Sequence, residues 1–151
     1  AAGSGDRTGA DRMSVPADAH HLAIPGGLQA AGEAREFAGK LLSEWALDAD
    51  AAYDVLLIVS ELVTNAVVHG VAPVHLWLWA ADGCVRGAVD DQGDGVPRLA
   101  GPGGLCGDDM SEHGRGLALV TAMARTVGWH RLPGGGLRVW FSYAVGGDGG
   151  A

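Results

Sequence analysis

The chain is poor in lysine, cysteine and aromatic residues. Lysine occurs once among 151 residues and the formal net charge is −8, so the clustered positive charge of nonspecific nucleic-acid binding is lacking. Two cysteines are too few for a disulfide framework, and no CxxC or HxxxH spacing supports a zinc site. No apolar run approaches the roughly 20 residues that span a membrane, and no signal-peptide pattern is visible. We therefore expect a cytoplasmic protein with no direct nucleic-acid or membrane contact.

Glycine and hydrophobic residues are plentiful instead. The 26 glycines indicate many loops, and 48% hydrophobic residues over this length predict one folded domain. Residues 1–19 are expected to form a disordered leader and residues 146–151 a disordered tail, because both are small, polar and aperiodic. The domain would then comprise residues 20–145.

Hydrophobic periodicity predicts the order of secondary structure. The expected elements are a strand at 21–25, a helix at 28–45, a helix that begins after Asp48 or Asp50 and ends at Gly70, a hairpin of 74–79 and 85–90 around Asp82-Gly83, a loop at 99–112, a helix at 116–125, and a hairpin of 127–132 and 137–143. Consecutive hairpins with few helices predict a two-layer α/β sandwich, with a mixed, mostly antiparallel sheet and the helices on one face.

Two sets of apolar side chains have an expected position in that sandwich. Trp77 and Trp79 alternate along a strand, so they either pack under the helices or form a partner surface, and packing is the favoured interpretation. The second helix is expected to face the core through one stripe, formed by Leu56, Ser60, Val63 and Val67.

The same helix carries polar residues on another face, in the stretch ELVTNAVVHG. Glu61, Asn65 and either Val68 or His69 share that face because they lie about one and two turns apart. An amide oxygen suits Mg²⁺, and a carboxylate one turn away can orient or deprotonate a hydroxyl or a water. The alternative is a solvated polar face.

A second candidate follows the second strand, in the stretch DQGDG. Gly93 and Gly95 let the backbone turn tightly and approach a flat ligand, and a preceding aspartate can accept a hydrogen bond from an exocyclic amine. Asp91 fits this role better than Asp90, because it gives the spacing D-x-G-x-G. The alternative is an ordinary surface turn.

A third candidate opens the third helix, in the stretch HGRGLALV. Free backbone N–H groups at Gly114 and Gly116 suit a phosphate, and Arg115 adds a charge-assisted contact. The spacing is neither that of a P-loop nor that of a Rossmann fingerprint. The alternative is a glycine-rich helix start. In this order the three stretches describe a Mg-ATP site.

Together these stretches resemble the histidine-kinase-like ATPases of the GHKL superfamily, which have the Bergerat fold. ELVTNAVVHG resembles the family's N box, DQGDG its first glycine box and GRGLALV its second, and the resemblance runs from about His20 to Tyr143. The E-L-V-T-N-A helix is most similar to that of the bacterial anti-sigma-factor serine kinases. The family's last strand commonly carries a threonine near the nucleotide, and Arg138 stands at the matching place.

The resemblance assigns roles to residues of this chain. It implies that Asn65 binds Mg²⁺, that Glu61 is the base or an orienting carboxylate, and that Asp91 reads adenine. Gly93 and Gly95 would shape the floor of the pocket, and His69 would border it. The lid over ATP would be about residues 99–113, and its phosphate-facing hinge would be formed by Gly114, Arg115, Gly116 and Leu117.

The resemblance also implies a function. The chain would use Mg-ATP to phosphorylate a serine or threonine on an anti-anti-sigma protein of the STAS type, and it would bind a sigma factor. A homodimer is compatible with this interpretation. The alternatives are a nucleotide-binding module that sequesters a partner with little or no kinase activity, and a detached ATPase domain of a histidine kinase.

Overall fold

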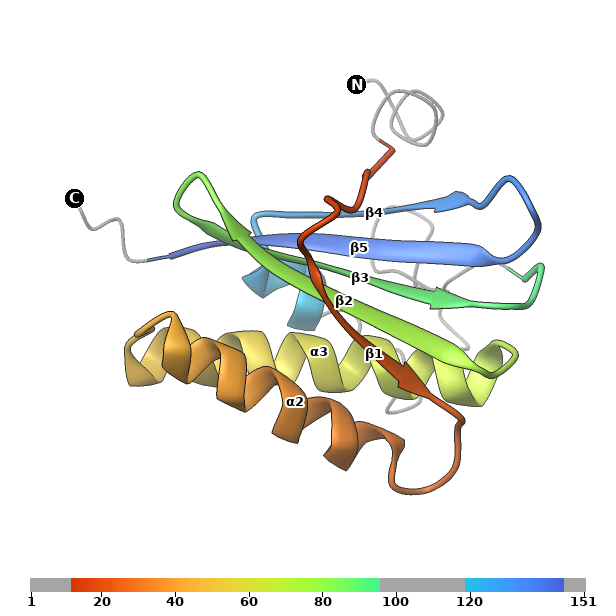
Figure 1. Ribbon diagram of the computed structural model, residues 1–151, viewed down its shortest axis with the longest axis horizontal. Coiled ribbons are helices and arrows are strands. Elements are labelled where there is room, and N and C mark those ends of the chain that lie inside the picture. Colours follow the sequence, from red (N-terminus) through yellow and green to blue (C-terminus); the bar gives the residue numbers. More distant parts are fainter. Residues whose placement is uncertain (1–11, 96–118, 146–151) are drawn as a thin grey trace.

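The computed structural model describes residues 12–95 and 119–145. Within these ranges a five-stranded sheet carries two long helices on one face (Figure 1). The elements in chain order are β1 (His20–Ile24), α2 (Ala30–Glu44), α3 (Ala49–His69), β2 (Val74–Ala81), β3 (Cys84–Asp91), β4 (Thr126–Arg131) and β5 (Leu137–Ala144). A helical turn at residues 119–123 precedes β4, within the helix predicted over 116–125.

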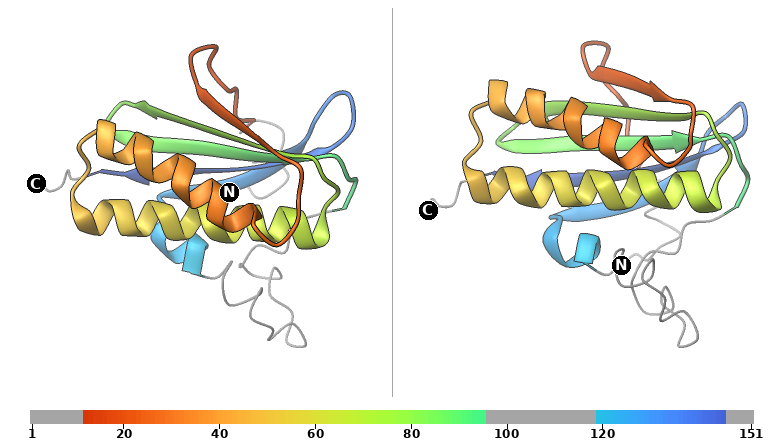
Figure 2. Two further views of the ribbon diagram at one scale, coloured as in Figure 1. Left: turned by 60° about the horizontal axis from the view of Figure 1, so that its bottom comes forward. Right: turned by 90° about the horizontal axis from the view of Figure 1, so that it is seen from below.

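The strands lie in the order β1-β2-β3-β5-β4, and each neighbouring pair is antiparallel. The two-layer α/β sandwich is therefore confirmed, and α2 and α3 lie side by side on the same face of the sheet (Figure 2). The predicted turn between β2 and β3 has positive φ at both central residues, 54° at Asp82 and 73° at Gly83. Asp-Gly is the sequence that favours this kind of hairpin turn.

Asp48, rather than Asp50, begins α3. Its Oδ1 accepts a hydrogen bond from the backbone N–H of Ala51 at 2.8 Å, which satisfies a donor that the helix leaves without a partner. The helix ends at Gly70, as predicted. The Gly70 backbone is extended, with φ −101° and ψ −156°, so this glycine is not the left-handed cap that ends many helices.

The core lies between the sheet and the two helices, and the predicted stripe on α3 is wrong in part. Val63 is buried, but Leu56, Ser60 and Val67 are only partly buried. The helix itself carries apolar residues on most of its sides, so its sequence is compatible with several different core-facing stripes. The buried apolar residues of this part of α3 are rotated from the predicted stripe, and they are Val55, Ile58, Val59, Leu62, Val63 and Ala66.

The tryptophans of β2 lie on the outer face of the sheet, away from the helices. Val74, Leu76 and Leu78 join the core, and side chains of a strand alternate between its faces. Trp77 and Trp79 therefore do not pack under the helices, which corrects the favoured interpretation. Trp79 is nevertheless only 6% exposed.

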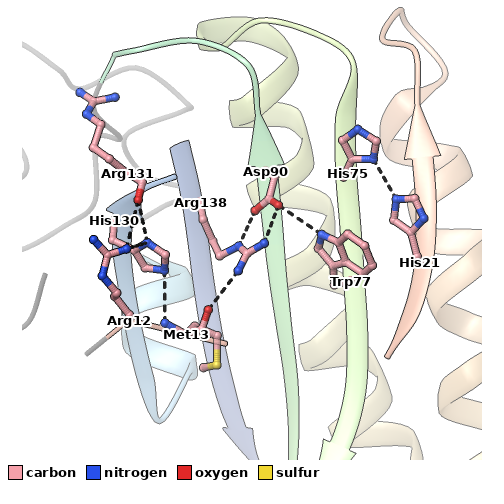
Figure 3. Close-up of polar contacts among 9 residues, drawn as sticks. All are labelled: Arg12, Met13, His21, His75, Trp77, Asp90, His130, Arg131 and Arg138. Atoms are coloured by element: carbon pink, nitrogen blue, oxygen red, sulfur yellow. Dashed lines mark hydrogen bonds and ion pairs between the residues drawn. The ribbon is translucent and has the colours of Figure 1, made fainter. Parts of the chain in front are cut away.

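A row of polar contacts crosses this outer face (Figure 3). Asp90 of β3 forms a bidentate ion pair with Arg138 of β5, at 2.7 and 2.8 Å, and accepts a hydrogen bond from Trp77 Nε1. Arg138 also donates to the carbonyl of Met13, and the Met13 N–H donates to His130 of β4. The last part of the expected leader, residues 12–19, is thus tied to the sheet at Met13.

By length and composition alone, α3 could span a membrane. Core helices of globular domains pass the same test, and this helix packs against α2, β2 and β3 with its apolar face buried. Its apolar composition therefore follows from its central position in the core.

Candidate functional site

A cavity lies where the C-terminal end of α3 meets the ends of β3 and β5. Its walls combine polar groups with apolar side chains from elements distant in sequence, and they are formed by Leu62, Asn65, Ala66, His69, Gly70, Asp91, Gly95, Leu137 and Val139. The backbone N–H of Gln92 donates to the Val71 carbonyl at 2.8 Å, which holds the end of β3 against the segment that follows α3. The N box and the first glycine box therefore meet in one place.

Asn65 contributes a buried amide to this cavity. The residue is 9% exposed, and its Oδ1 has no hydrogen-bond partner among the residues that the structure describes. A buried acceptor without a partner is costly, so it indicates a position for a ligand. An amide oxygen is a suitable ligand for Mg²⁺, and Asn65 therefore fits the metal that the family resemblance implies.

The described residues include no group of three His, Cys, Asp or Glu side chains that could hold a metal ion. A Mg²⁺ ion at Asn65 would accordingly take its remaining ligands from nucleotide phosphates and water, which is how proteins commonly bind this ion. The metal and the nucleotide would then bind together.

Asp91 presents a carboxylate to the same cavity and is 5% exposed. Its Oδ1 accepts hydrogen bonds from the backbone N–H of Gly93 at 2.7 Å and of Val71 at 3.4 Å. These bonds fix the carboxylate and leave its other oxygen, Oδ2, beside Gly70. Asp90 instead points to the outer face, where it is paired with Arg138. The side chains of the two neighbouring aspartates therefore lie on opposite faces of the sheet.

Gly70 makes room for that carboxylate. A Cβ atom built on Gly70 would lie 2.5 Å from Asp91 Cγ and 2.6 Å from both Asp91 Oδ2 and the Ala66 carbonyl oxygen. Sequence reasoning treated this residue only as the end of a helix. Its extended backbone is open to any residue, so the close approach of Asp91 and of the Ala66 carbonyl oxygen is what requires glycine here.

The other predicted residues of the N box and first glycine box are placed as follows. His69 lines the cavity and is exposed, and Gly95 lines it as well. Gly93 turns the chain at the Asp91 carboxylate, where its own Cβ would lie 3.2 Å from Oδ1. Glu61 is half-buried one turn before Asn65 and is not among the lining residues.

Two predicted parts of the site lie outside the described residues. They are the second glycine box, with Gly114, Arg115, Gly116 and Leu117, and the predicted lid, residues 99–113. Arg138 is described, and it does not take the place of a nucleotide-facing threonine. Its guanidinium is bound to Asp90 on the outer face, whereas its neighbours Leu137 and Val139 face the cavity.

The cavity is narrow, with a volume of about 20 Å³. That space holds about one water molecule.

Comparisons with known proteins agree with this fold. Residues 24–143 match the family model of the histidine kinase-like ATPase domain. The crystal structure of the RsbU and RsbW domains of Rv1364c from Mycobacterium tuberculosis is similar to the chain, with a TM-score of 0.63 and 24% sequence identity. The similarity covers 86% of this chain and 33% of that chain, and at this identity it supports the fold alone. No curated protein sequence matches the chain significantly.

Proposed function

This chain belongs to the histidine kinase-like ATPase domain family, and from that premise we propose that it is a protein serine/threonine kinase that regulates a sigma factor. Its substrates are Mg-ATP and a hydroxyl group on an anti-anti-sigma protein of the STAS type. The observation that carries the proposal is the pair of buried polar groups in one cavity, the Asn65 amide and the Asp91 carboxylate.

Each group of that pair suits one part of the nucleotide. Asp91 Oδ2 accepts a hydrogen bond from the exocyclic amine of adenine, while Oδ1 stays bound to the backbone. Guanine presents a carbonyl in place of that amine, so a carboxylate held in this way favours adenine. Asn65 holds Mg²⁺, which neutralises charge on the phosphates when bound.

Glu61 accepts the proton in the transfer step. The serine or threonine oxygen of the partner attacks the γ-phosphorus of ATP, its proton passes to the Glu61 carboxylate, and the bond to the β–γ bridging oxygen breaks to release ADP. Glu61 lies one turn before Asn65 on α3, which supports a position of the Glu61 carboxylate beside the phosphates. Arg115 at the second glycine box offsets the charge of the transferred group.

The test is phosphate transfer from radiolabelled Mg-ATP to a STAS-type partner. We expect Glu61→Gln to abolish labelling of the partner while ATP affinity stays close to that of the unchanged protein. Glu36→Gln is a matched control, because Glu36 is an exposed glutamate on α2. Full labelling by the Glu61 variant would remove this residue from the proposed role.

The partners follow from the same proposal. The domain binds a sigma factor when it is not acting on the STAS-type protein. The net charge of −8 is compatible with a basic surface on that sigma factor. The resemblance of the E-L-V-T-N-A stretch, residues 61–66, to the anti-sigma-factor serine kinases supports this partner class. A cytoplasmic location and a homodimer belong to the same proposal, and sedimentation with and without ATP tests the dimer.

One observation favours a second candidate function. Glu61 is not among the residues that line the cavity. In this second candidate function the domain sequesters its partner. The nucleotide only orders the domain, and no phosphate is transferred. A stable, ATP-dependent complex without labelled partner supports this alternative.

A further inference from the structure

A second hollow, of about 660 Å³, lies on the outer face of the sheet, opposite the face that carries α3 and the nucleotide cavity. It lies across β3, β5 and β4 and is bounded by the segment before β1. Three arginines and one carboxylate are among its lining residues, which are Arg12, Met13, Asp82, Cys84, Arg86, Arg125, Thr126, Trp140 and Ser142. In a chain with net charge −8, this is a local excess of positive charge.

The strand register sets the donors of this hollow side by side. Arg86 of β3 is paired with Ser142 of β5, and Ser142 is paired with Thr126 of β4. These three side chains therefore form one row on the outer face. The backbone N–H of Arg125 donates to the Ser142 carbonyl at 2.7 Å, which places Arg125 at the end of that row.

Two buried donors in the hollow lack an acceptor. Neither Arg86 Nε nor Trp140 Nε1 has a hydrogen-bond partner among the described residues, and Trp140 is only 6% exposed. Trp140 lies diagonally across from Arg86 on the same face. Its indole also leans over Gly128 of β4, where a Cβ atom would lie 2.3 Å from the ring. The indole therefore packs directly against the backbone at Gly128.

The other arginines of the outer face differ, because they already have partners. The Arg138 guanidinium is bound to Asp90 and to the Met13 carbonyl, and Arg12 contacts His130 and the Arg131 carbonyl (Figure 3). Buried N–H groups in proteins are nearly always paired. The Arg86 Nε–H and the Trp140 indole N–H have no acceptor among the described residues, so this site suits a ligand that only accepts hydrogen bonds.

We propose that this hollow is a binding site for an oxyanion, a phosphate or a carboxylate group, held by Arg86, Trp140 and Arg125. Arg86 and Trp140 donate from the floor and Arg125 donates from the exposed rim. Ser142 supplies a hydroxyl donor between them. The site is separate from the nucleotide cavity, because the sheet lies between the two, and it does not depend on the proposed kinase activity.

The indole N–H signal of Trp140 in a ¹⁵N-correlation spectrum tests this proposal. The signal is assigned with Trp140→Phe and followed during titration with inorganic phosphate and, separately, with succinate, at constant ionic strength. We expect a saturable movement of the Trp140 signal, with the other tryptophan indoles much less affected. The probe that saturates at lower concentration identifies the oxyanion class.

Variants make the result specific. Arg86→Gln should raise the dissociation constant at least about tenfold, as expected for loss of a charge-assisted bond, and Arg125→Gln several-fold. Arg125 is exposed, so its variant keeps the test valid if Arg86→Gln fails to fold. Arg35→Gln, on α2, is the matched control and should bind like the unchanged protein. A Trp140 signal that does not saturate with either probe, or that responds equally in the Arg86 and Arg125 variants, overturns the proposal.

Discussion

The replacement Gly70→Ala tests how the cavity is built. Alanine adopts the Gly70 backbone conformation freely, so the effect of the added Cβ is steric. That atom would lie 2.5 Å from Asp91 Cγ and 2.6 Å from the Ala66 carbonyl oxygen, both closer than van der Waals contact. We expect the Asp91 carboxylate to move and its backbone hydrogen bonds to weaken. Overpacking of this kind costs about 1–3 kcal/mol of the free energy of unfolding.

The effect on binding should be of about the same size as the effect on stability. A displaced Asp91 loses a charged hydrogen bond to the base, of about 1.5–3 kcal/mol, which corresponds to roughly 10- to 100-fold weaker ADP binding. Calorimetric titration with ADP measures this change. Gly32→Ala is the control, because nothing lies within 4 Å of its Cβ position on α2, and it should stabilise the helix by about 0.5–1 kcal/mol. A folded Gly70→Ala protein with unchanged ADP affinity would refute this account of Gly70.

Three further predictions concern other contacts. Asn65→Leu should keep the fold but remove the gain in ATP affinity that Mg²⁺ provides, as measured by titration with and without the ion. Burial, together with the hydrogen bond to Asp54, raises the pKa of Tyr143 to about 12, so part of the stability should be lost as pH rises from 10 through 12. Tyr143→Phe should lower the free energy of unfolding by about 1–2 kcal/mol at neutral pH and reduce that loss, as denaturant titrations at several pH values would measure. Asp90→Ala should cost about 3–5 kcal/mol, because Arg138 is left charged and largely buried, and chemical denaturation measures that cost.

Local chemistry made much of the fold predictable from the sequence. Three predicted features depend on neighbouring residues only, namely a helix cap at Asp48 or Asp50, the Asp82-Gly83 turn and the alternation along β2. The meeting of Asn65 with Asp91 was predicted through motifs, since no periodicity brings the end of α3 to the end of β3.

Other features could not be read from the sequence because they depend on packing between elements. Nothing near Gly70 in the chain reveals that Asp91 approaches it. Trp77 and Trp79 are large and apolar, so the core seemed their natural place, but the leucines of β2 fill it. Arg138 pairs with Asp90 through strand register, which only the sheet defines.

The central claim is that the cavity between α3 and the ends of β3 and β5 binds adenine nucleotide through Asp91. Its most direct test is calorimetric titration of Mg-ATP into the unchanged protein and into Asp91→Asn. We predict saturable binding to the unchanged protein and at least about tenfold weaker binding to the variant, with the fold retained. Equal affinity in the two proteins, or no binding of ATP or ADP at millimolar concentration to the unchanged protein, would contradict the claim.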